Sequence, residues 1–265
     1  MDWMEVIRTR RSVRTFDGRR PSEEDLENLK ELIRGIDDPF GIKTEFLFLD
    51  TEEYGLSTPV IRGEKMYMTA KIPKMPHGEE AYGYAFEKAV LYAWSLGLGT
   101  TWIGGTMKRE DFEKASDTGK DECMYCISPL GYPAKKMSFR EAAMRKGVRA
   151  DSRRPAEQLF FDGNWDTPLQ TDDPALKNAL EAVRLAPSAV NKQPWRILKD
   201  GNSCHFYVRH DKGFGGPGTG DMQKIDLGIA LCHFMMFVKG TLRISDPGIP
   251  AAENTEYIAT VTLEP

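Results

Sequence analysis

The chain has 265 residues, of which 40% are hydrophobic and 29% are charged, and its formal net charge is -4. This composition is typical of an ordinary globular protein with one large or two small domains. The slight acidity gives no support for a nucleic-acid partner, and the most apolar run, over 227–238, is too short to span a bilayer. Asp2 and Glu5 stand where a signal peptide needs basic and then apolar residues. We therefore expect a cytoplasmic protein that binds neither nucleic acid nor membrane.

Four cysteines do not make a disulfide framework in a chain of this length. Cys123 and Cys126 form a lone C-x-x-C pattern, a spacing that can hold zinc or support redox chemistry. The run over 124–127 predicts a strand, however, and side chains three apart on a strand point to opposite faces. No second C-x-x-C or histidine pair completes a tetrahedron, so we expect no metal site.

The first part of the chain alternates helices and strands. Ser22 is expected to cap a helix, because Asp25 follows at the third position and leucines recur at helical spacing from Leu26. A long apolar helix should stop at Gly97, and Pro129 should end a strand. In chain order we expect a helix over 3–10, a helix after Ser22, a strand over 46–49, a helix over 81–96, a β-branched segment over 100–103, a strand over 124–127 and a helix over 139–148.

The second part repeats this order. Asp172 or Asp173 should cap a helix that begins at Pro174, and Asp221 or the residues before it should start an apolar helix. The expected elements are the helix from Pro174, a strand over 204–208, a helix over 221–238 and strands over 243–244 and 257–263. The triplet Gly-Tyr-Ala at 83–85 matches Gly-Ile-Ala at 228–230. We therefore expect an α+β fold of two degenerate repeats, over 1–161 and 162–265, with buried central helices.

A cluster of cations follows the first helix. Arg10, Arg11, Ser12 and Arg14 place three guanidinium groups and a hydroxyl within five residues. Arginine forks supply the charge-assisted donors, in fixed geometry, that a dianionic phosphate needs. A solvated basic loop is the alternative, since most short basic runs lie on surfaces.

The second repeat carries the string P-S-A-V-N-K-Q-P-W over 187–195. Ser188, Asn191 and Gln193 place short polar groups on a turn before Trp195. A simple helix exit is the alternative, because serine, asparagine and proline routinely end helices. A helix exit explains the turn but not the whole string.

Three other features are less specific. Gly104 and Gly105 end the segment over 96–105, and glycines let backbone amides approach a ligand, although a tight turn explains them equally well. Arg153 is either a ligand-binding cation or a surface charge. The glycine-rich stretch over 213–221 lacks the G-x-G-x-x-G spacing, and Pro217 removes an amide, so we expect a connecting loop there.

The strings over 8–14 (R-x-R-R-S-x-R) and 187–195 resemble the two parts of the flavin mononucleotide (FMN) site of the nitroreductase family. In that family the arginine string grips the flavin phosphate, ribityl chain and pyrimidine edge, and the second string comes from the opposite subunit. Similar glycine segments present a backbone N–H to flavin N5, and a further arginine at the place of Arg153 binds the phosphate. The resemblance implies FMN as cofactor, bound by Arg10, Arg11, Ser12, Arg14, Gly104, Gly105, Arg153, Pro187, Ser188, Ala189 and Asn191.

The wide separation of the two strings implies an unusual architecture. Family chains carry both strings near their start, whereas here each repeat keeps the string that the other lacks. The resemblance thus implies a nitroreductase-like fold fused in tandem, an intramolecular pseudo-dimer around central helices. A homodimer has two equivalent sites by symmetry. Here one complete FMN site between the halves is expected, in a monomer.

The implied activity is electron transfer from NAD(P)H, as a transient donor, through FMN to a small-molecule acceptor such as a nitroaromatic or a quinone. The flavin carries the redox chemistry, so no catalytic side chain is expected. Two alternatives remain open. One is a flavin-binding or storage protein without turnover, and the other is a flavin-destructive or dehalogenating relative.

Overall fold

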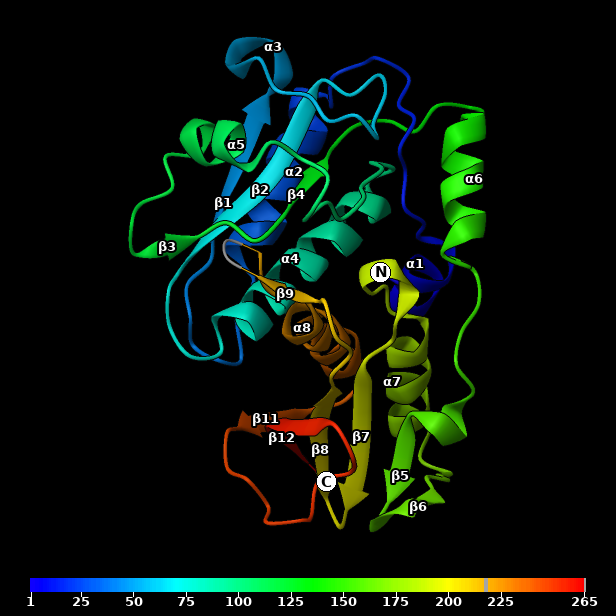
Figure 1. The fold of residues 1–265 in the computed structure, drawn as a ribbon. Helices are drawn as coiled ribbons and strands as arrows, with labels where there is room; N and C mark the ends of the chain where they lie inside the picture. The colour runs from blue at the N-terminus through cyan, green and yellow to red at the C-terminus, as the bar shows by residue number, and fades with distance from the viewer. Residues whose placement is uncertain (217–218, 265) are drawn as a thin grey trace.

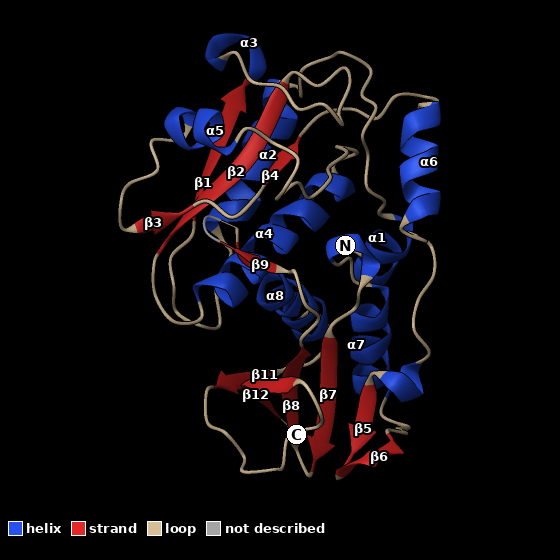
Figure 2. Ribbon diagram, viewed as in Figure 1, coloured by secondary structure: helices blue, strands red, loops and turns tan. Residues whose placement is uncertain are grey.

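The computed structural model describes residues 1–216 and 219–264. The two larger β-sheets lie at opposite ends of the molecule, and the long helices lie between them (Figure 1, Figure 2). The first half of the chain builds one sheet and the second half builds the other. The protein therefore has the expected mixture of helix and sheet, arranged as two degenerate repeats.

The first repeat begins with two capped helices. Asp2 accepts from the N–H of Met4 (3.0 Å) at the start of α1 (Trp3–Thr9), and Ser22 accepts from the N–H of Asp25 (3.0 Å) at the start of α2 (Glu23–Arg34). The other elements are β1 (Glu45–Asp50), α3 (Thr51–Tyr54), β2 (Met66–Pro73), α4 (Gly78–Ser95), α5 (Arg109–Ala115), β3 (Glu122–Cys123), β4 (Ile127–Pro129) and α6 (Phe139–Gly147). Strands β1, β3 and β4 all pair antiparallel with β2, which is the central strand.

The second repeat builds a six-stranded sheet in the order β11-β12-β8-β7-β5-β6, in which only the pairing of β5 with β7 is parallel. Asp173 caps α7 and Asp221 caps α8, both within the predicted alternatives. The predicted boundary between residues 161 and 162 falls within β5. The elements are η1 (Ala156–Gln158), β5 (Phe160–Asp162), β6 (Asn164–Pro168), α7 (Pro174–Leu185), η2 (Ala189–Asn191), β7 (Trp195–Asp200), β8 (Ser203–Arg209), β9 (Gly215–Gly216), β10 (Gly220–Asp221), α8 (Met222–Met235), β11 (Gly240–Arg243) and β12 (Thr255–Leu263).

The two repeats meet through α4 and α8, which pack against each other in the middle of the molecule (Figure 1). A Cβ placed on Gly83 would lie 2.1 Å from the carbonyl oxygen of Ile225, and one on Gly228 would lie 2.0 Å from that of Glu80. Glycine is required at both positions, because any side chain would collide with the backbone of the other helix. The two matching triplets therefore mark the crossing point, to which each repeat contributes one glycine.

Apolar cores lie on both sides of this helix pair. One core joins the second sheet to α7 and α8 and includes Trp195, Phe206 and Phe234; the other joins the first sheet to α2 and α4 and includes Met68 and Phe86. All five of these side chains are fully buried, and each such burial stabilises the fold by about 1.5–3 kcal/mol. Because α4 and α8 are covered on nearly all sides, both are apolar around most of their circumference.

Several predicted element boundaries differ from the structure, and tertiary contacts explain the largest difference. The strand expected over 124–127 is broken, because the Tyr82 hydroxyl bonds to the backbone of Cys126 and Arg109 donates to the carbonyls of Met124 and Tyr125. The segment over 100–103 forms isolated bridges. Helix α8 ends at Met235 rather than at residue 238, and β11 covers Gly240–Arg243 rather than 243–244.

The structure also shows where the cysteines and the glycine-rich stretch lie. All four cysteines are free, and Cys126 lies outside the strands. The described residues contain no group of three histidine, cysteine, aspartate or glutamate side chains that could hold a metal ion. Nor does any helix within 1–216 and 219–264 have the length and apolarity needed to cross a membrane. Of the expected loop over 213–221, Pro217 and Gly218 lie outside the described residues, and β9 pairs with β10 on either side.

Candidate functional site

The arginine segment over 10–16 leaves α1 as an extended chain that is fixed by bridges. Ser12 forms a parallel bridge with Thr100, and the N–H of Val13 donates to the carbonyl of Thr100 (2.8 Å). Val13 and Phe16 are buried and anchor the segment in the core. The predicted binding residues on this segment are all half-buried: Arg10, Arg11, Ser12 and Arg14.

Electrostatics distinguishes the arginines of this segment. Arg11 Nη1 pairs with the buried carboxylate of Glu141 on α6 (3.3 Å), so its charge is already compensated. Burial lowers the pKa of Arg10 and of Arg14, and the nearby cation Arg145 of α6 lowers both further. Glu87 opposes the shift at Arg10, and Glu141 opposes it at Arg14. Arg10 and Arg14 are therefore the cations best placed to gain from an added anion.

Arg153 joins this cluster from the segment between the repeats. Its guanidinium donates to the carbonyls of Leu185 (3.0 Å), Ala150 (2.8 Å) and Ser152 (2.7 Å), which fix its position. Burial lowers the pKa of Arg153, and Arg10 is the largest charge that adds to the shift. The structure thus brings Arg153 into electrostatic range of Arg10, although the two residues lie at opposite ends of the first repeat.

The loop over 187–193 of the second repeat is held in a strained conformation. Val190, Asn191 and Gln193 have φ of 42°, 58° and 53°, a left-handed region that side chains other than glycine rarely adopt. Two hydrogen bonds stabilise the loop in this strained conformation. The Gln193 N–H donates to Ser188 Oγ (2.8 Å), and the Ala189 N–H donates to Asp226 Oδ1 (3.0 Å). Such strain persists only where the surroundings enforce it, and it is concentrated at functional sites.

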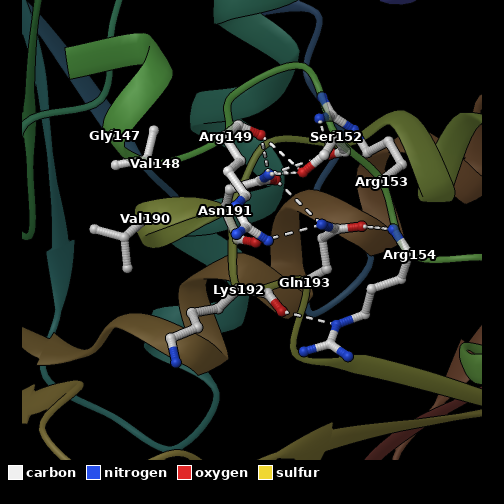
Figure 3. A pocket seen from close by; sticks show the side chains of 10 residues that line it. All are labelled: Gly147, Val148, Arg149, Ser152, Arg153, Arg154, Val190, Asn191, Lys192 and Gln193. Carbon is white, nitrogen blue, oxygen red and sulfur yellow. Dashed lines mark hydrogen bonds between the residues drawn. The ribbon is translucent and has the colours of Figure 1, made fainter. Parts of the chain in front are cut away.

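Asn191 ties this loop to the first repeat. Its Nδ2 donates to the carbonyls of Arg149 (2.7 Å) and Ser152 (3.1 Å), and the N–H of Arg154 donates to Gln193 Oε1 (2.8 Å). The two segments enclose a pocket of about 510 Å³ (Figure 3). Its lining is mostly polar and cationic and consists of Gly147, Val148, Arg149, Ser152, Arg153, Arg154, Val190, Asn191, Lys192 and Gln193.

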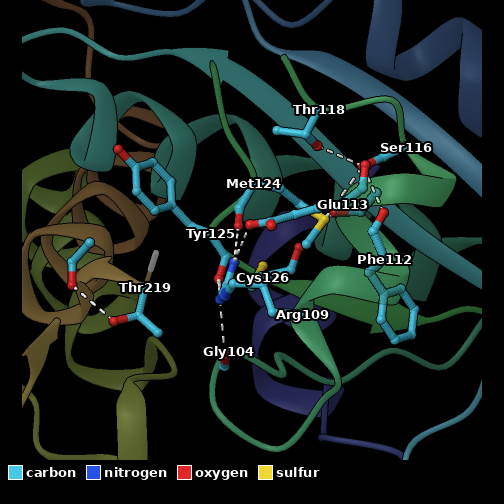
Figure 4. A network of polar contacts seen from close by, with 12 residues as sticks. Gly104, Arg109, Phe112, Glu113, Ser116, Thr118, Met124, Tyr125, Cys126 and Thr219 are labelled. Carbon is cyan, nitrogen blue, oxygen red and sulfur yellow. Dashed lines mark hydrogen bonds and ion pairs between the residues drawn. The ribbon is translucent and has the colours of Figure 1, made fainter. Parts of the chain in front are cut away.

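Arg109 of α5 holds the glycine segment through its guanidinium group. The Arg109 guanidinium donates to the carbonyls of Gly104 (3.1 Å), Tyr125 (3.0 Å) and Met124 (Figure 4). Gly105 is exposed, and a Cβ placed on it would meet no atom within 4 Å. The backbone at Gly105 therefore borders open space, as a ligand-facing segment requires.

The predicted site residues form two groups that the arginine segment connects. At the junction of the repeats, Arg153 lies in electrostatic range of Arg10, and Asn191 of the 187–193 loop donates to the adjacent Ser152 carbonyl. Gly104 and Gly105 connect to the arginine segment through the bridge between Ser12 and Thr100. The second repeat also reaches the glycines, because Met222 Sδ lies 4.0 Å from a Cβ placed on Gly104. Sequence reasoning missed Arg145, Asp226 and Arg109. Only Arg145 gave a signal, as one cation of the basic run over 140–149.

Two degenerate α+β repeats around crossed central helices, with arginines of one repeat facing a loop of the other, define a fused nitroreductase-like protein. The family model described as "Putative TM nitroreductase" matches residues 2–237, and the chain belongs to this family. No curated protein matches the chain.

One solved structure supports the fold over the whole chain, and others are similar to part of it. The chain is similar to a "putative nitroreductase" from Thermotoga maritima MSB8, at 22% identity and a TM-score of 0.64, over 100% of this chain and 95% of that chain. It is also similar to a nitroreductase family protein from Clostridium novyi NT, at 18% identity and a TM-score of 0.45, over 51% of this chain and 87% of that chain. An FMN-dependent nitroreductase from Clostridium difficile R20291 matches at 17% identity and a TM-score of 0.43, over 52% of this chain and 92% of that chain.

Proposed function

We propose that this protein is an FMN-dependent oxidoreductase that passes electrons from NAD(P)H, through one FMN held between its repeats, to a small organic acceptor. One observation carries the proposal: Arg10, Arg14 and Arg153 all lie within electrostatic range of Arg145. Ser152, the neighbour of Arg153, accepts a hydrogen bond from Asn191 of the strained loop. The convergence joins the two motifs that family resemblance assigns to one flavin. We further propose that the protein acts as a cytoplasmic monomer.

The donor set fits a flavin phosphate. Arg10 and Arg153 are neighbouring cations that repel each other, and each has a pKa lowered by burial. A dianionic phosphate would relieve both effects, since guanidinium groups bind phosphate oxygens through paired, charge-assisted hydrogen bonds. Four of the five N–H groups of Arg153 already donate to backbone carbonyls, which fixes the guanidinium and leaves one N–H for a phosphate oxygen. Arg153 would therefore contribute mainly its fixed positive charge.

When bound, FMN supplies the hydride and electron transfer. The residues of this chain would bind it, orient it and shape access to it. Arg10, Arg14 and Arg153 would hold the anionic groups, and the 187–193 loop would line the ribityl chain and ring. Gly105 borders open space, which would leave room for a nicotinamide or an acceptor beside the flavin. Arg109 would keep the Gly104 carbonyl turned away from the ligand.

Anaerobic titration with NADH or NADPH tests the function. Protein reconstituted with FMN should lose the flavin's yellow absorbance, and a nitroaromatic or a quinone should restore it. A flavin that stays oxidised would indicate a storage protein, and fragments of the flavin would indicate a destructive enzyme. Either result would contradict the proposal.

A further inference from the structure

Three arginines that the proposed flavin site does not use are Arg154, Arg196 and Arg209. Arg196 of β7 lies directly opposite Tyr207 of β8, and Arg209 stands two residues further along β8. Side chains two apart on a strand share a face, so Arg196 and Arg209 are diagonal neighbours on one face of the sheet. Phe206 points to the opposite face, where it packs against α8. The two arginines therefore lie on the face turned away from the central helices.

Hydrogen bonds bring Arg154 to the same place. The backbone carbonyls over 192–194, at the end of the strained loop, accept from the three arginines in turn. Arg154 Nε donates to the first carbonyl (3.4 Å; Figure 3), and Arg196 Nη1 donates to the second (3.1 Å). The backbone N–H of Arg209 donates to the third (2.8 Å). Because Arg154 also lines the pocket of about 510 Å³, the three residues meet along a short stretch of chain beside that pocket.

No carboxylate neutralises these guanidinium groups. In the described part of the chain none of the three forms an ion pair, and Nε and Nη2 of the buried Arg196 have no hydrogen-bond partner. Burial, and then repulsion from Arg154 and Arg209, lowers the pKa of Arg196 to about 10. Asp211 opposes this shift, but its carboxylate is already paired with Lys192 (3.1 Å). The cluster therefore carries positive charge that an added anion would compensate.

We infer that Arg154, Arg196 and Arg209 form a second anion site, which binds the 2′-phosphate of NADPH. A phosphomonoester carries a charge of about −1.5 to −2 near pH 7 and offers three acceptor oxygens, which guanidinium forks match. NADH lacks this group, and each phosphate of the diphosphate that both nucleotides share carries only a single charge. Arg153 and Arg154 both line the pocket, so the second site borders the flavin site. The choice of NADPH rests on the proposed function, whereas the anion site does not.

Calorimetric titration with NADP⁺ and NAD⁺ tests the site on the full chain, both with and without FMN. NADP⁺ should bind roughly tenfold to a hundredfold more tightly than NAD⁺, because the two nucleotides differ only in the 2′-phosphate. The preference should shrink as the NaCl concentration is raised, because salt screens exposed charges. Absent or equal binding of the two nucleotides would overturn the site.

Two variants assign the preference to the cluster. Arg209→Gln removes one charge at an exposed position, where the change does not disturb packing, and should lower the preference for NADP⁺ roughly threefold to tenfold. Arg196→Met removes the buried charge and should lower it roughly tenfold to a hundredfold. Arg243→Gln is the matched control, since Arg243 is also exposed and lies on β11, at the edge of the same sheet, and it should leave the preference unchanged.

FMN affinity of the same variants separates this cluster from the flavin site. Arg209→Gln should bind FMN as tightly as the native chain does. A matching loss of FMN affinity would show that the cluster binds the flavin phosphate and would overturn a second site, as would an unchanged preference for NADP⁺ in Arg209→Gln. If the native chain binds no FMN, the proposed function fails, while the nucleotide titration still decides whether the cluster binds the 2′-phosphate.

Discussion

Helices α4 and α8 occupy equivalent places in the two repeats, but the segments that follow them differ. After α4 the chain makes isolated bridges and reaches Gly105, whose backbone borders open space. After α8, strand β11 pairs with β12 over four residues, and a Cβ on Gly240 would lie 2.7 Å from the carbonyl oxygen of Thr262. The comparison shows that a duplicated fold can keep its helix crossing while one copy leaves its backbone open to a ligand and the other uses it in a sheet.

The crossing itself also differs between the repeats. Gly83 faces Ile225 and Gly228 faces Glu80, so a carboxylate on α4 stands where α8 has an apolar side chain. The first repeat thus carries a buried acid at the crossing that packing alone does not require.

Gly228→Ala should lower the free energy of unfolding by more than about 3 kcal/mol, because the new methyl group would lie 2.0 Å from the carbonyl oxygen of Glu80 and push the helices apart. Urea denaturation measures the change. Gly147→Ala on α6 is the control, since a Cβ there meets no atom within 4 Å, and it should shift stability by less than about 1 kcal/mol. Equal stability of the two variants would mean that the crossing is not the shared frame of the repeats.

Glu80 should make stability fall as pH rises. Burial raises the pKa of Glu80 from its ordinary 4.5 to about 7, and among the described residues its Oε2 has no hydrogen-bond partner. The folded state therefore holds a proton that the unfolded state has lost between these values, so stability declines across this window by up to about 3 kcal/mol. Glu80→Gln should flatten the decline in a pH series of urea denaturation. An unchanged slope in that variant would assign the pH dependence to other groups.

Arg14→Ala and Asn191→Ala, in different repeats, should weaken the same flavin. Loss of a charge-assisted bond at Arg14 should reduce FMN affinity roughly tenfold to a hundredfold. Because Asn191 is neutral, its loss should reduce the affinity by about tenfold or less. Quenching of FMN fluorescence measures the affinity. Lys199→Ala is the control, since Lys199 Nζ donates to the Gly201 carbonyl at a hairpin away from the site. If the Arg14→Ala variant keeps full FMN affinity, the N-terminal arginine string is a basic surface that does not bind the flavin.

Gly105→Ala should change the free energy of unfolding by less than about 1 kcal/mol, because a Cβ there meets open space. Gly240→Ala, in the segment that follows α8, should destabilise by about 1–3 kcal/mol, because its Cβ would collide with β12. Thermal denaturation of both variants checks the contrast. Equal losses would remove the distinction between an open and a paired segment.

The sequence predicted elements whose signals are local. Ser22, Asp173 and Asp221 cap helices because their side chains bond to nearby N–H groups. The matching glycine triplets indicated the repeat, and they lie on the two helices that were expected to be buried and central. The sequence did not reveal β2, which is buried along almost its whole length and so shows no alternation. Nor did it reveal the break in the strand at Cys126, which depends on a hydrogen bond from Tyr82 on the distant helix α4.

The same distinction holds for the site. The arginine and proline-serine strings were visible as motifs, because their residues are neighbours in the chain. Arg145 and Asp226 act across elements, and no spacing in the sequence connects them with Arg10 or Ala189. Residues that support a site through tertiary contacts therefore had to be found in the structure.

The number of FMN molecules per chain distinguishes a single site shared by the repeats from two independent sites. Each repeat keeps the motif that the other lacks, and the structure brings Arg10, Arg153 and Asn191 together at one junction. Purified protein should therefore release one FMN per chain and behave as a monomer in light scattering. Two FMN molecules per chain, or an obligate dimer with flavin at the interface between chains, would contradict the account.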